Sequence, residues 1–349
     1  SVRDALRDSV ASRSRAMNHG RRLRHATLDF DGLPVPVAGH QPGSAYNGHF
    51  RDTVYHPLVT TCAELGDMIA ARLRRGTAHA AEAATDALLG DVRWAKQHLA
   101  ANVAVRMDAG MPSEELLAAL EAERTPYVAR LRNNAVLDRL AQPHLKRPPG
   151  RRPDQPRTWV SEHVYRAKSW SRERRVVLVV VERPDELLLH HFWLLTSWTC
   201  DKVQGGEVLE RYRRRGTAEG HLGELKDVLG LKLSSAPRGA FSSDWRSHFI
   251  GPVRPCDDPF FRANDALLQL CALAYNAMHL VRGLCEYALP GEDGAGWSLR
   301  RVRERVLRVA ARVSLHARRV TVIVTEAAGR SWSEIWKHWR RLDAPALAR

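Results

Sequence analysis

One short segment, RYRRRGTAEGHLGELKDVLG at residues 211–230, places a carboxylate among cations at helical intervals. The groups spaced by three, four and seven residues are Tyr212, Arg215, Glu219 and Lys226. At about 100° per residue they span roughly 60° of a helix, so one face presents all four. A carboxylate in this setting can serve an active site while its cationic neighbours grip phosphate groups. The alternative is a solvated helix face, which would spread its charges over a broader arc and would not need a tyrosine in line.

Acidic residues also stand at the ends of two predicted strands, beside glycine. The segment LDFDG carries Asp29 and Asp31, and VRMDAG carries Asp108. Asp29 and Asp31 share a strand face, because side chains two apart point the same way. An acid at a strand end points into a cleft at the sheet edge. Taken alone, each segment also fits an ordinary Asp–Gly turn.

The elements that must position these acids follow from hydrophobic periodicity. Strands are predicted at 27–39, 51–61, 67–76, 102–110 and 126–132, and helices at 78–101 and 112–123. Three consecutive strands form a meander, and the helices then cross over to add parallel strands. This order predicts a layered α/β sheet and excludes a barrel.

A proline-rich segment separates this region from the rest of the chain. Residues 142–158 hold five prolines and are predicted to form a linker or mobile loop. Three β-rich runs follow and indicate a small antiparallel insertion; they lie at 159–170, 174–184 and 186–198. Helices are then predicted at 205–229, 264–288 and 298–312, with an irregular stretch at 233–262.

The charge balance points to a polyanionic partner. The net charge is +15, and it is uneven along the chain. Residues 1–27 carry seven Arg against two Asp, and residues 298–349 carry thirteen Lys and Arg against four acids. Such basic blocks attract nucleic acid. The alternative is that a GC-rich genome encodes arginine wherever a surface charge is tolerated. Residues 1–26 are Arg- and Ser-rich and are predicted to be weakly helical at best.

The cysteine spacing and the lack of long apolar runs argue against a disulfide-rich, zinc-binding or membrane-spanning protein. The five cysteines are scattered without CxxC pairing, which disfavours a disulfide framework or a zinc site. No apolar run approaches the ~18 residues of a membrane span. We therefore expect a cytoplasmic protein. The chain begins at Ser1 without methionine or a signal peptide, and we expect a fragment.

The spacing Y-x2-R-x3-E-x6-K is the signature of one large branch of bacterial insertion-sequence transposases, and the chain resembles that family over roughly 27–340. The segment YRRRGTAEGHLGELK resembles the family's third-carboxylate region. LDFDG and VRMDAG resemble its first- and second-Asp strands, and LCALAYNAMHLVR resembles its apolar helix after the signature. The family also places a β-rich insertion between the second Asp and the Glu, where the three β-rich runs lie here.

The resemblance implies a DDE transposase with an RNase H-like (retroviral-integrase-like) mixed sheet flanked by helices. Its catalytic and metal-binding trio would be Asp31, Asp108 and Glu219. These carboxylates would hold two Mg²⁺ ions, for which Mn²⁺ can substitute. The implied reaction is phosphodiester cleavage at transposon ends and strand transfer into target DNA. A homodimer in the synaptic complex and a bacterial, nucleoid-associated location are also implied by the resemblance.

The implied DNA contacts are Tyr212, Arg215, Lys226, Arg106 and Trp198. Trp193 and Trp198 could stack on an extruded base, although a tryptophan on a strand is more often part of a core. We expect the stripe of Trp332, Trp336 and Trp339 to be a packing surface. His49 and His221 are expected to be surface hydrogen-bonding residues rather than metal ligands.

The sequence departs from the family in two places. The first-Asp strand reads Asp31–Gly32–Leu33 and lacks the threonine that usually follows, so Asp29 remains the alternative first ligand. The amino-terminal region is short for an end-binding domain. The expected domains are a basic N-terminal segment (1–26), a first core part (27–132), an insertion with its linker (133–204), a second core part with the catalytic helix (205–290) and a basic helical C-terminal region (291–349).

Two other functions remain open. One is a catalytically inactive or truncated transposase-derived protein that grips DNA through its basic surface. The other is an RNase H-like nuclease, which the long insertion and the four-residue signature disfavour. Metal-dependent joining of a 3′-end into target DNA would identify a transposase. Salt-sensitive binding without cleavage would identify the DNA-binding remnant.

Overall fold

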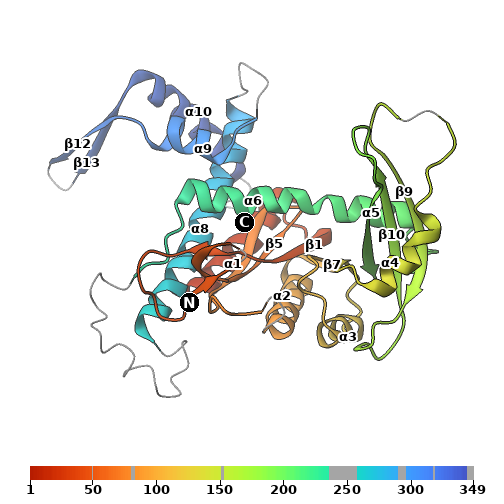
Figure 1. Cartoon of the computed structure of the whole chain (residues 1–349). Coiled ribbons are helices and arrows are strands. Elements are labelled where there is room, and N and C mark those ends of the chain that lie inside the picture. Colours follow the sequence, from red (N-terminus) through yellow and green to blue (C-terminus); the bar gives the residue numbers. More distant parts are fainter. Residues whose placement is uncertain are drawn as a thin grey trace.

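A computed structural model shows one large mixed sheet with helices on both faces (Figure 1). The structure describes residues 1–48, 50–79, 83–150, 153–235, 258–289, 296–316 and 319–343. The sheet has eight strands in the order β6-β5-β1-β7-β8-β11-β10-β9. The layered α/β architecture predicted from the sequence is therefore confirmed.

The first five strands of this order form the core. They are β6 (Asp67–Arg72), β5 (Leu58–Cys62), β1 (Leu23–Gly32), β7 (Ala100–Met107) and β8 (Tyr127–Leu131). Strands β1, β5 and β6 pair antiparallel as the predicted meander, and β7 and β8 add parallel to β1. Helices α2 (Ala84–His98) and α3 (Glu114–Ala122) make the two crossovers. A meander followed by two parallel strands is the RNase H-like topology.

The predicted insertion strands continue the core sheet. They are β9 (Arg157–Tyr165), β10 (Arg174–Glu182) and β11 (His190–Thr196), and they pair antiparallel with one another as expected. Strand β11 also pairs with β8, so the insertion shares hydrogen bonds with the core. It is preceded by α4 (Ala135–Ala141) and the short helix η1 (Gln142–His144).

A second, small sheet lies between β1 and β5 in the chain. Its strands are β2 (Val35–Pro36), β3 (Ala45–Asn47) and β4 (Asp52–Tyr55). The sequence predicted single strands at 27–39 and 51–61, and the structure divides each of them in two. Pro34 and Pro57 stand beside the breaks, where a residue without an N–H cannot continue the ladder.

The expectation for residues 1–26 was wrong. Helix α1 (Val2–Met17) begins with a capping box between Ser1 and Asp4 and buries Leu6 and Val10. It packs along β6 and helix α8 (Pro259–Ala288). Few residues of α1 are apolar, so the helix is stabilised mainly by its contacts with β6 and α8.

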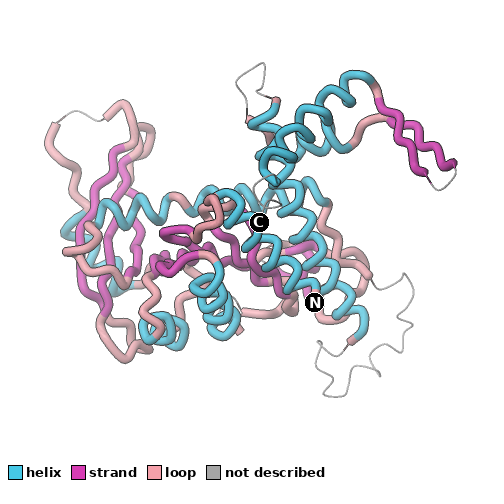
Figure 2. The backbone as a smooth tube through the Cα atoms, turned by 180° about the vertical axis from the view of Figure 1, so that it is seen from behind, coloured by secondary structure: helices cyan, strands magenta, loops and turns pink. Residues whose placement is uncertain are grey.

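The two faces of the core sheet carry different helices. Residues of α2 and α3 share one hydrophobic cluster with β1 and β7, and residues of α6 and α8 share another with β5 and β6. The catalytic-helix segment predicted at 205–229 is α5 (Gly205–Arg213) and α6 (Arg215–Leu229), separated by the single residue Arg214. Figure 2 shows the tube from behind, with α8 crossing the sheet.

The C-terminal region contains strands that the sequence did not predict. Helix α9 (Leu299–Val302) and the π-helical turn η3 (Arg303–Leu307) lead into a hairpin of β12 (Ala311–His316) and β13 (Arg319–Val324), and α10 (Glu326–Asp343) follows. The predicted packing stripe is only partly correct: Trp339 packs into a cluster with α8, whereas Trp332 and Trp336 are exposed. Among the described helices, none is long and apolar enough to cross a membrane.

Candidate active site

The ends of β1 and β7 bring two carboxylates together. The last pair of their parallel ladder joins Phe30 to Met107. The next positions are Asp31 on β1 and Asp108 directly after β7, so both acids stand at the carboxyl ends of two neighbouring parallel strands. Residues paired across neighbouring strands point to the same face. The sequence predicted both acids as strand-end residues, and the sheet brings them together.

Asp29, two residues before Asp31, forms a buried ion pair with Arg106. Its side chain is 4% exposed and accepts hydrogen bonds from Nε and Nη2 of Arg106, both at 2.6 Å. Burial raises the pKa of Asp29, and the bond to Arg106 opposes that shift. Because both carboxylate oxygens hold the guanidinium, this environment favours Asp31 over Asp29 as the acid that faces a ligand.

The same ion pair corrects one predicted DNA contact. The Arg106 side chain is 5% exposed, and its Nη1 donates to the carbonyl of Arg211 at 3.0 Å. Arg106 therefore joins β7 to β1 and to α5 inside the protein. A guanidinium with these partners is not presented to a DNA backbone.

Asp31 is more accessible and sits among cations. Its side chain is 23% exposed, Oδ1 accepts the backbone N–H of Gly32 at 2.8 Å, and Oδ2 pairs with Arg215. Burial lowers the pKa of Lys226, while the charges of Asp227 and Asp31 oppose the shift. The two cations of α6 that the sequence grouped with Glu219 thus interact with Asp31.

Position 219 lies on α6 between Arg215 and Lys226. It is four residues after the first and seven before the second, so the helix carries all three on one side. The Glu219 side chain is outside the described residues, as is His49. Tyr212 belongs to α5 and packs against the cluster of β8, β10 and β11. The interruption at Arg214 separates it from the other three positions.

One residue beside the acids was not found from the sequence. The ring of His56 lies over Gly32, where a Cβ atom would come within 2.6 Å of Nε2. Its Nδ1 is 3.2 Å from the carbonyl of Ala78, and burial lowers the pKa of His56. The sequence held no spacing signal for this contact, because the antiparallel pairing of β1 with β5, which places Gly32 opposite Leu58, brings Gly32 close to His56.

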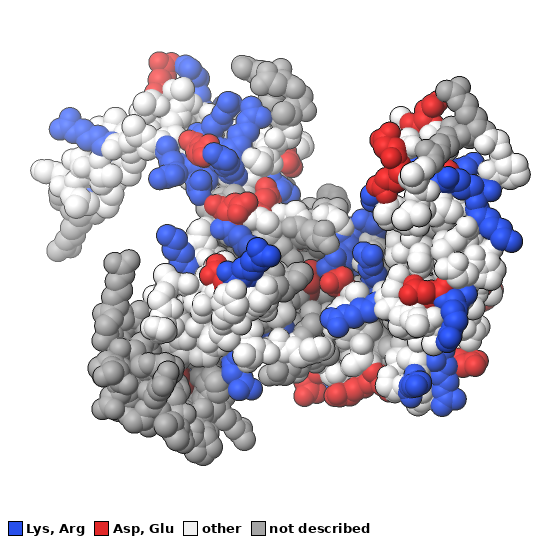
Figure 3. Space-filling model, viewed as in Figure 1, with Lys and Arg blue, Asp and Glu red and all other residues white. Residues whose placement is uncertain are grey.

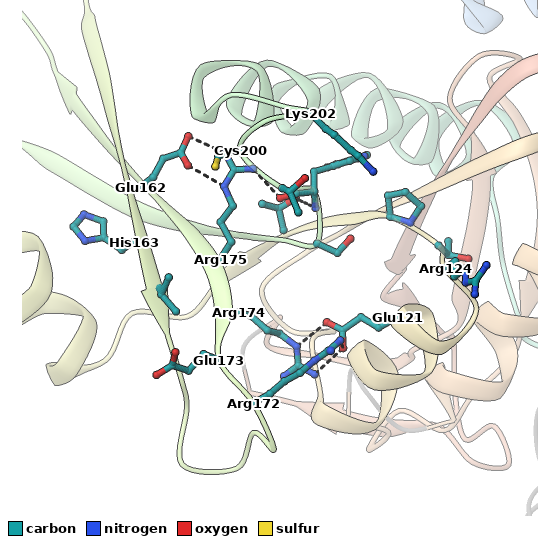
Figure 4. A pocket seen from close by; sticks show the side chains of 17 residues that line it. Glu121, Arg124, Glu162, His163, Arg172, Glu173, Arg174, Arg175, Cys200 and Lys202 are labelled. Carbon is teal, nitrogen blue, oxygen red and sulfur yellow. Dashed lines mark hydrogen bonds and ion pairs between the residues drawn. The ribbon is translucent and has the colours of Figure 1, made fainter.

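The two tryptophans of the insertion have different environments. Trp193 is fully buried, which confirms the core interpretation for that residue. Trp198 is partly exposed, with the guanidinium of Arg211 over its ring at 4.6 Å. It lines an open cavity of about 920 Å³ between the insertion strands and the turn after α3 (Figure 4). Neither Asp31 nor Asp108 lines this cavity.

His221 is not a surface residue. It is 9% exposed, and its Nδ1 lies 2.8 Å from the hydroxyl of Tyr275 on α8. The prediction that it is a hydrogen-bonding residue is correct, but its partner is in the core. The face of α6 that carries His221 is turned away from Asp31.

The described acids fit part of a magnesium site. Among the described side chains, no three His, Cys, Asp or Glu residues are arranged to hold a metal ion, and Glu219 is not among those side chains. Asp108 makes no hydrogen bond or ion pair with any described side chain and stands beside Asp31. Carboxylate oxygens are the ligands that Mg²⁺ prefers, and one or two suffice when substrate phosphates and water complete the shell.

Comparison with known proteins identifies the family. The model of the transposase DDE domain, group 1, matches residues 4–240, which is more than half of the chain. No curated protein matches. A solved structure, the piggyBac transposase synaptic complex with hairpin DNA, aligns with a TM-score of 0.43 and 13% identity. The alignment covers 81% of this chain and 51% of that one, so this chain spans about half the length of the solved relative.

Proposed function

We propose that this chain, which belongs to the family of transposase DDE domains, cuts phosphodiester bonds at transposon ends and joins the 3′-ends to target DNA. The observation that carries the proposal is that Asp31 and Asp108 directly follow the last paired residues, Phe30 and Met107, of the parallel strands β1 and β7. The cationic face of α6 meets this pair through Arg215. Carboxylates at strand ends of a rigid sheet can hold the divalent ions that promote in-line phosphoryl displacement.

The proposed trio is Asp31, Asp108 and Glu219. Two divalent ions bound by such a trio would activate the attacking water or 3′-hydroxyl and stabilise the leaving oxygen. The chain's own contribution is to hold the carboxylates on rigid elements, two on strand ends and one on a helix. Asp31, Asp108 and Glu219 would together supply the carboxylate oxygens that hold the ions.

Arg215 and Lys226 are proposed to bind the substrate phosphates. In the structure Arg215 neutralises Asp31, which keeps two neighbouring carboxylates from repelling each other. Cations bound to Asp31 would take over this role and release the guanidinium for a phosphate oxygen, which it can bind in bidentate geometry. Lys226 provides a compact second charge on the same face.

The partner is proposed to be DNA, bound by a homodimer in the synaptic complex. Lys and Arg side chains gather over the C-terminal region around α9 (Figure 3). In the same region Arg305, Arg308 and Arg312 are exposed and make no ion pair with any described acid. Tyr212 and Trp198 are proposed to contact DNA beside the insertion. The signature spacing supports an insertion-sequence element as the source of the ends.

The test is strand nicking and joining on labelled DNA that carries the element's own ends, with Mg²⁺ or Mn²⁺. We compare the wild type with Asp108→Asn and Glu219→Gln, and use Glu207→Gln as the control for an exposed acid on the preceding helix. We expect both site variants to bind DNA and lose cleavage, and the control to cleave normally. Equal behaviour of all four proteins, with DNA binding intact, would leave a DNA-binding remnant. Nicking without joining would indicate a nuclease.

A further inference from the structure

A buried polar cluster links α6 to the core on the side opposite Asp31. Its members come from four elements: α1, β6, α6 and α8. They are Arg13, Asp67, His221, Glu224, Tyr275, His279 and Arg282. None of them belongs to the proposed trio or to the proposed phosphate contacts. Three of them, Asp67, Tyr275 and His279, are at most 5% exposed.

Two contacts reach α6 directly. Nδ1 of His221 lies 2.8 Å from the hydroxyl of Tyr275, and Nη1 of Arg282 donates to Glu224 at 3.4 Å. Glu224 also accepts the backbone N–H of Leu299, the first residue of α9, at 3.1 Å. The helix is therefore held by directional bonds from α8 and α9 at two points one turn apart.

The rest of the cluster fixes α8 itself. Nη2 of Arg282 contacts Nε2 of His279, and Nδ1 of His279 lies 3.1 Å from Asp67 on β6. Nδ1 of His279 also lies 3.0 Å from Nη1 of Arg13, so the imidazole joins Arg13, Asp67 and Arg282. Asp67 also pairs with Arg13 of α1. A continuous path of hydrogen bonds thus runs from α1 through β6 and α8 to α6.

The packing around the two histidines leaves no room for adjustment. The rings of His221 and His279 lie 5.4 Å apart at 79°, and His279 stacks on Tyr275. Gly66, which has a φ of +69°, lies in the turn before β6 beside both imidazoles, and a Cβ atom there would lie 3.2 Å from Cε1 of His221. A Cβ atom at this position would lie 2.5 Å from Cε1 of His279. The turn thus needs glycine for its backbone and for this contact.

Helix geometry connects the cluster to the active site. His221 is two residues after position 219, about 200° around the helix, so it faces α8 while the other side of α6 faces the sheet edge. The apolar residues of the inner face, Leu222 and Leu225, are buried but impose no direction. A hydrogen bond to a fixed hydroxyl does impose one, because its strength falls steeply with misalignment.

We propose that His221 and Tyr275 are positioning residues that set the rotation of α6, and so the placement of Glu219 against Asp31 and Asp108. This inference rests on the proposed function of the trio. Neither residue touches substrate in this account; both act through the helix. Rotation of α6 by even a fraction of a turn would move its carboxylate from the strand-end acids, whereas packing of the inner leucines would tolerate it.

The test compares Tyr275→Phe with Tyr55→Phe. Both changes remove one buried, hydrogen-bonded hydroxyl from the same core cluster, but Tyr55 bonds to Pro42 and Asn264 rather than to α6. The readouts are nicking rate at saturating DNA, the Mn²⁺ concentration for half-maximal rate, DNA affinity, thermal midpoint, and amide hydrogen exchange of peptides covering 215–229.

We expect Tyr275→Phe to lower the nicking rate or raise the Mn²⁺ requirement by about 10–100-fold, as for other groups that orient metal-binding residues. Exchange in 215–229 should be faster, with DNA affinity and thermal midpoint matching those of Tyr55→Phe. His221→Gln, which keeps a polar group, should recover part of what His221→Ala loses.

Two results would overturn the inference. One is that Tyr275→Phe and Tyr55→Phe give the same rate, Mn²⁺ requirement and exchange pattern while the wild type cleaves; the proposed function would then stand and the positioning role would fail. The other is that the wild type shows no metal-dependent cleavage and α6 exchange is unchanged in Tyr275→Phe. In that case the proposed function fails as well.

Discussion

Asp29 and Asp31 are two residues apart on one strand face, and substitution should separate their roles completely. Asp29→Asn removes the charge from a pair whose side chains are 4% and 5% exposed. Water cannot reach Arg106 to replace the lost carboxylate, so the variant holds a buried, uncompensated guanidinium. Breaking such a pair costs about 3–5 kcal/mol of unfolding free energy.

Asp31→Asn should behave in the opposite way. Asp31 is 23% exposed and stands beside another carboxylate, so its removal relieves repulsion while it loses the contact with Arg215. Arg215 is itself 9% exposed, so the loss of this partner still destabilises the fold, but less than in Asp29→Asn because Asp31 is more accessible than Asp29. We therefore expect a smaller loss of stability than for Asp29→Asn, together with loss of metal-dependent nicking.

The assay is urea unfolding followed by tryptophan fluorescence, paired with the nicking reaction on the same preparations. Asp29→Leu combined with Arg106→Met is the control, because an apolar pair of similar volume avoids the uncompensated charge and should regain most of the lost stability. The reasoning would be refuted if Asp29→Asn were as stable as the wild type and inactive while Asp31→Asn still cleaved. Asp29 would then be the first ligand.

Three further outcomes are expected. Gly32→Ala should cost about 1–3 kcal/mol, because the new methyl group overlaps a histidine ring that is held from its other side; urea unfolding measures this, and wild-type stability would contradict it. The pKa of Glu114 is lowered to about 2, chiefly by its hydrogen bond to Arg174. The ionised Glu114 therefore contributes stability above the unfolded pKa of 4.5, and this contribution is lost as the pH falls toward 2. Arg174→Met should make the free energy of unfolding depend less on pH between those two values. If the pH dependence were unchanged, the Glu114–Arg174 pair would not be its source. Among the described cysteines, Cys200 is exposed whereas burial raises the pKa of Cys62, so a thiol reagent followed by mass spectrometry should modify Cys200 first, and faster labelling of Cys62 would show that the core opens.

The order of elements in the core could be predicted from the sequence. Each strand of the meander and each crossover helix carries its own periodicity, and the rules for connecting strands then leave few topologies. The strand-end acids Asp31 and Asp108 follow from the same reading, because a carboxylate beside glycine at the end of a buried strand is a local pattern. The helical grouping of Arg215, position 219 and Lys226 is local too.

Helix α1 and the hairpin of β12 and β13 were not predicted from the sequence. The sequence of α1 is polar, and its stability comes from contacts with β6 and α8 that are distant in the chain. The hairpin was missed although it has a local signal: β13 reads RVTVIV, a run of β-branched residues typical of a strand.

The sequence by itself determined which residue types stand at the strand ends and that Arg215, position 219 and Lys226 share one side of a helix. Only the tertiary structure decided which aspartate is accessible. Asp29 and Asp31 have the same chemistry and the same strand face, and the difference between them is Arg106, which the parallel pairing of β1 and β7 places opposite Asp29. Likewise, His221 became a core residue because α8 brings Tyr275 within 2.8 Å of it. Arg106 and Tyr275 are far from their partners in the sequence. Strand register and helix packing bring them together, so the spacing of residues along the chain does not predict these contacts.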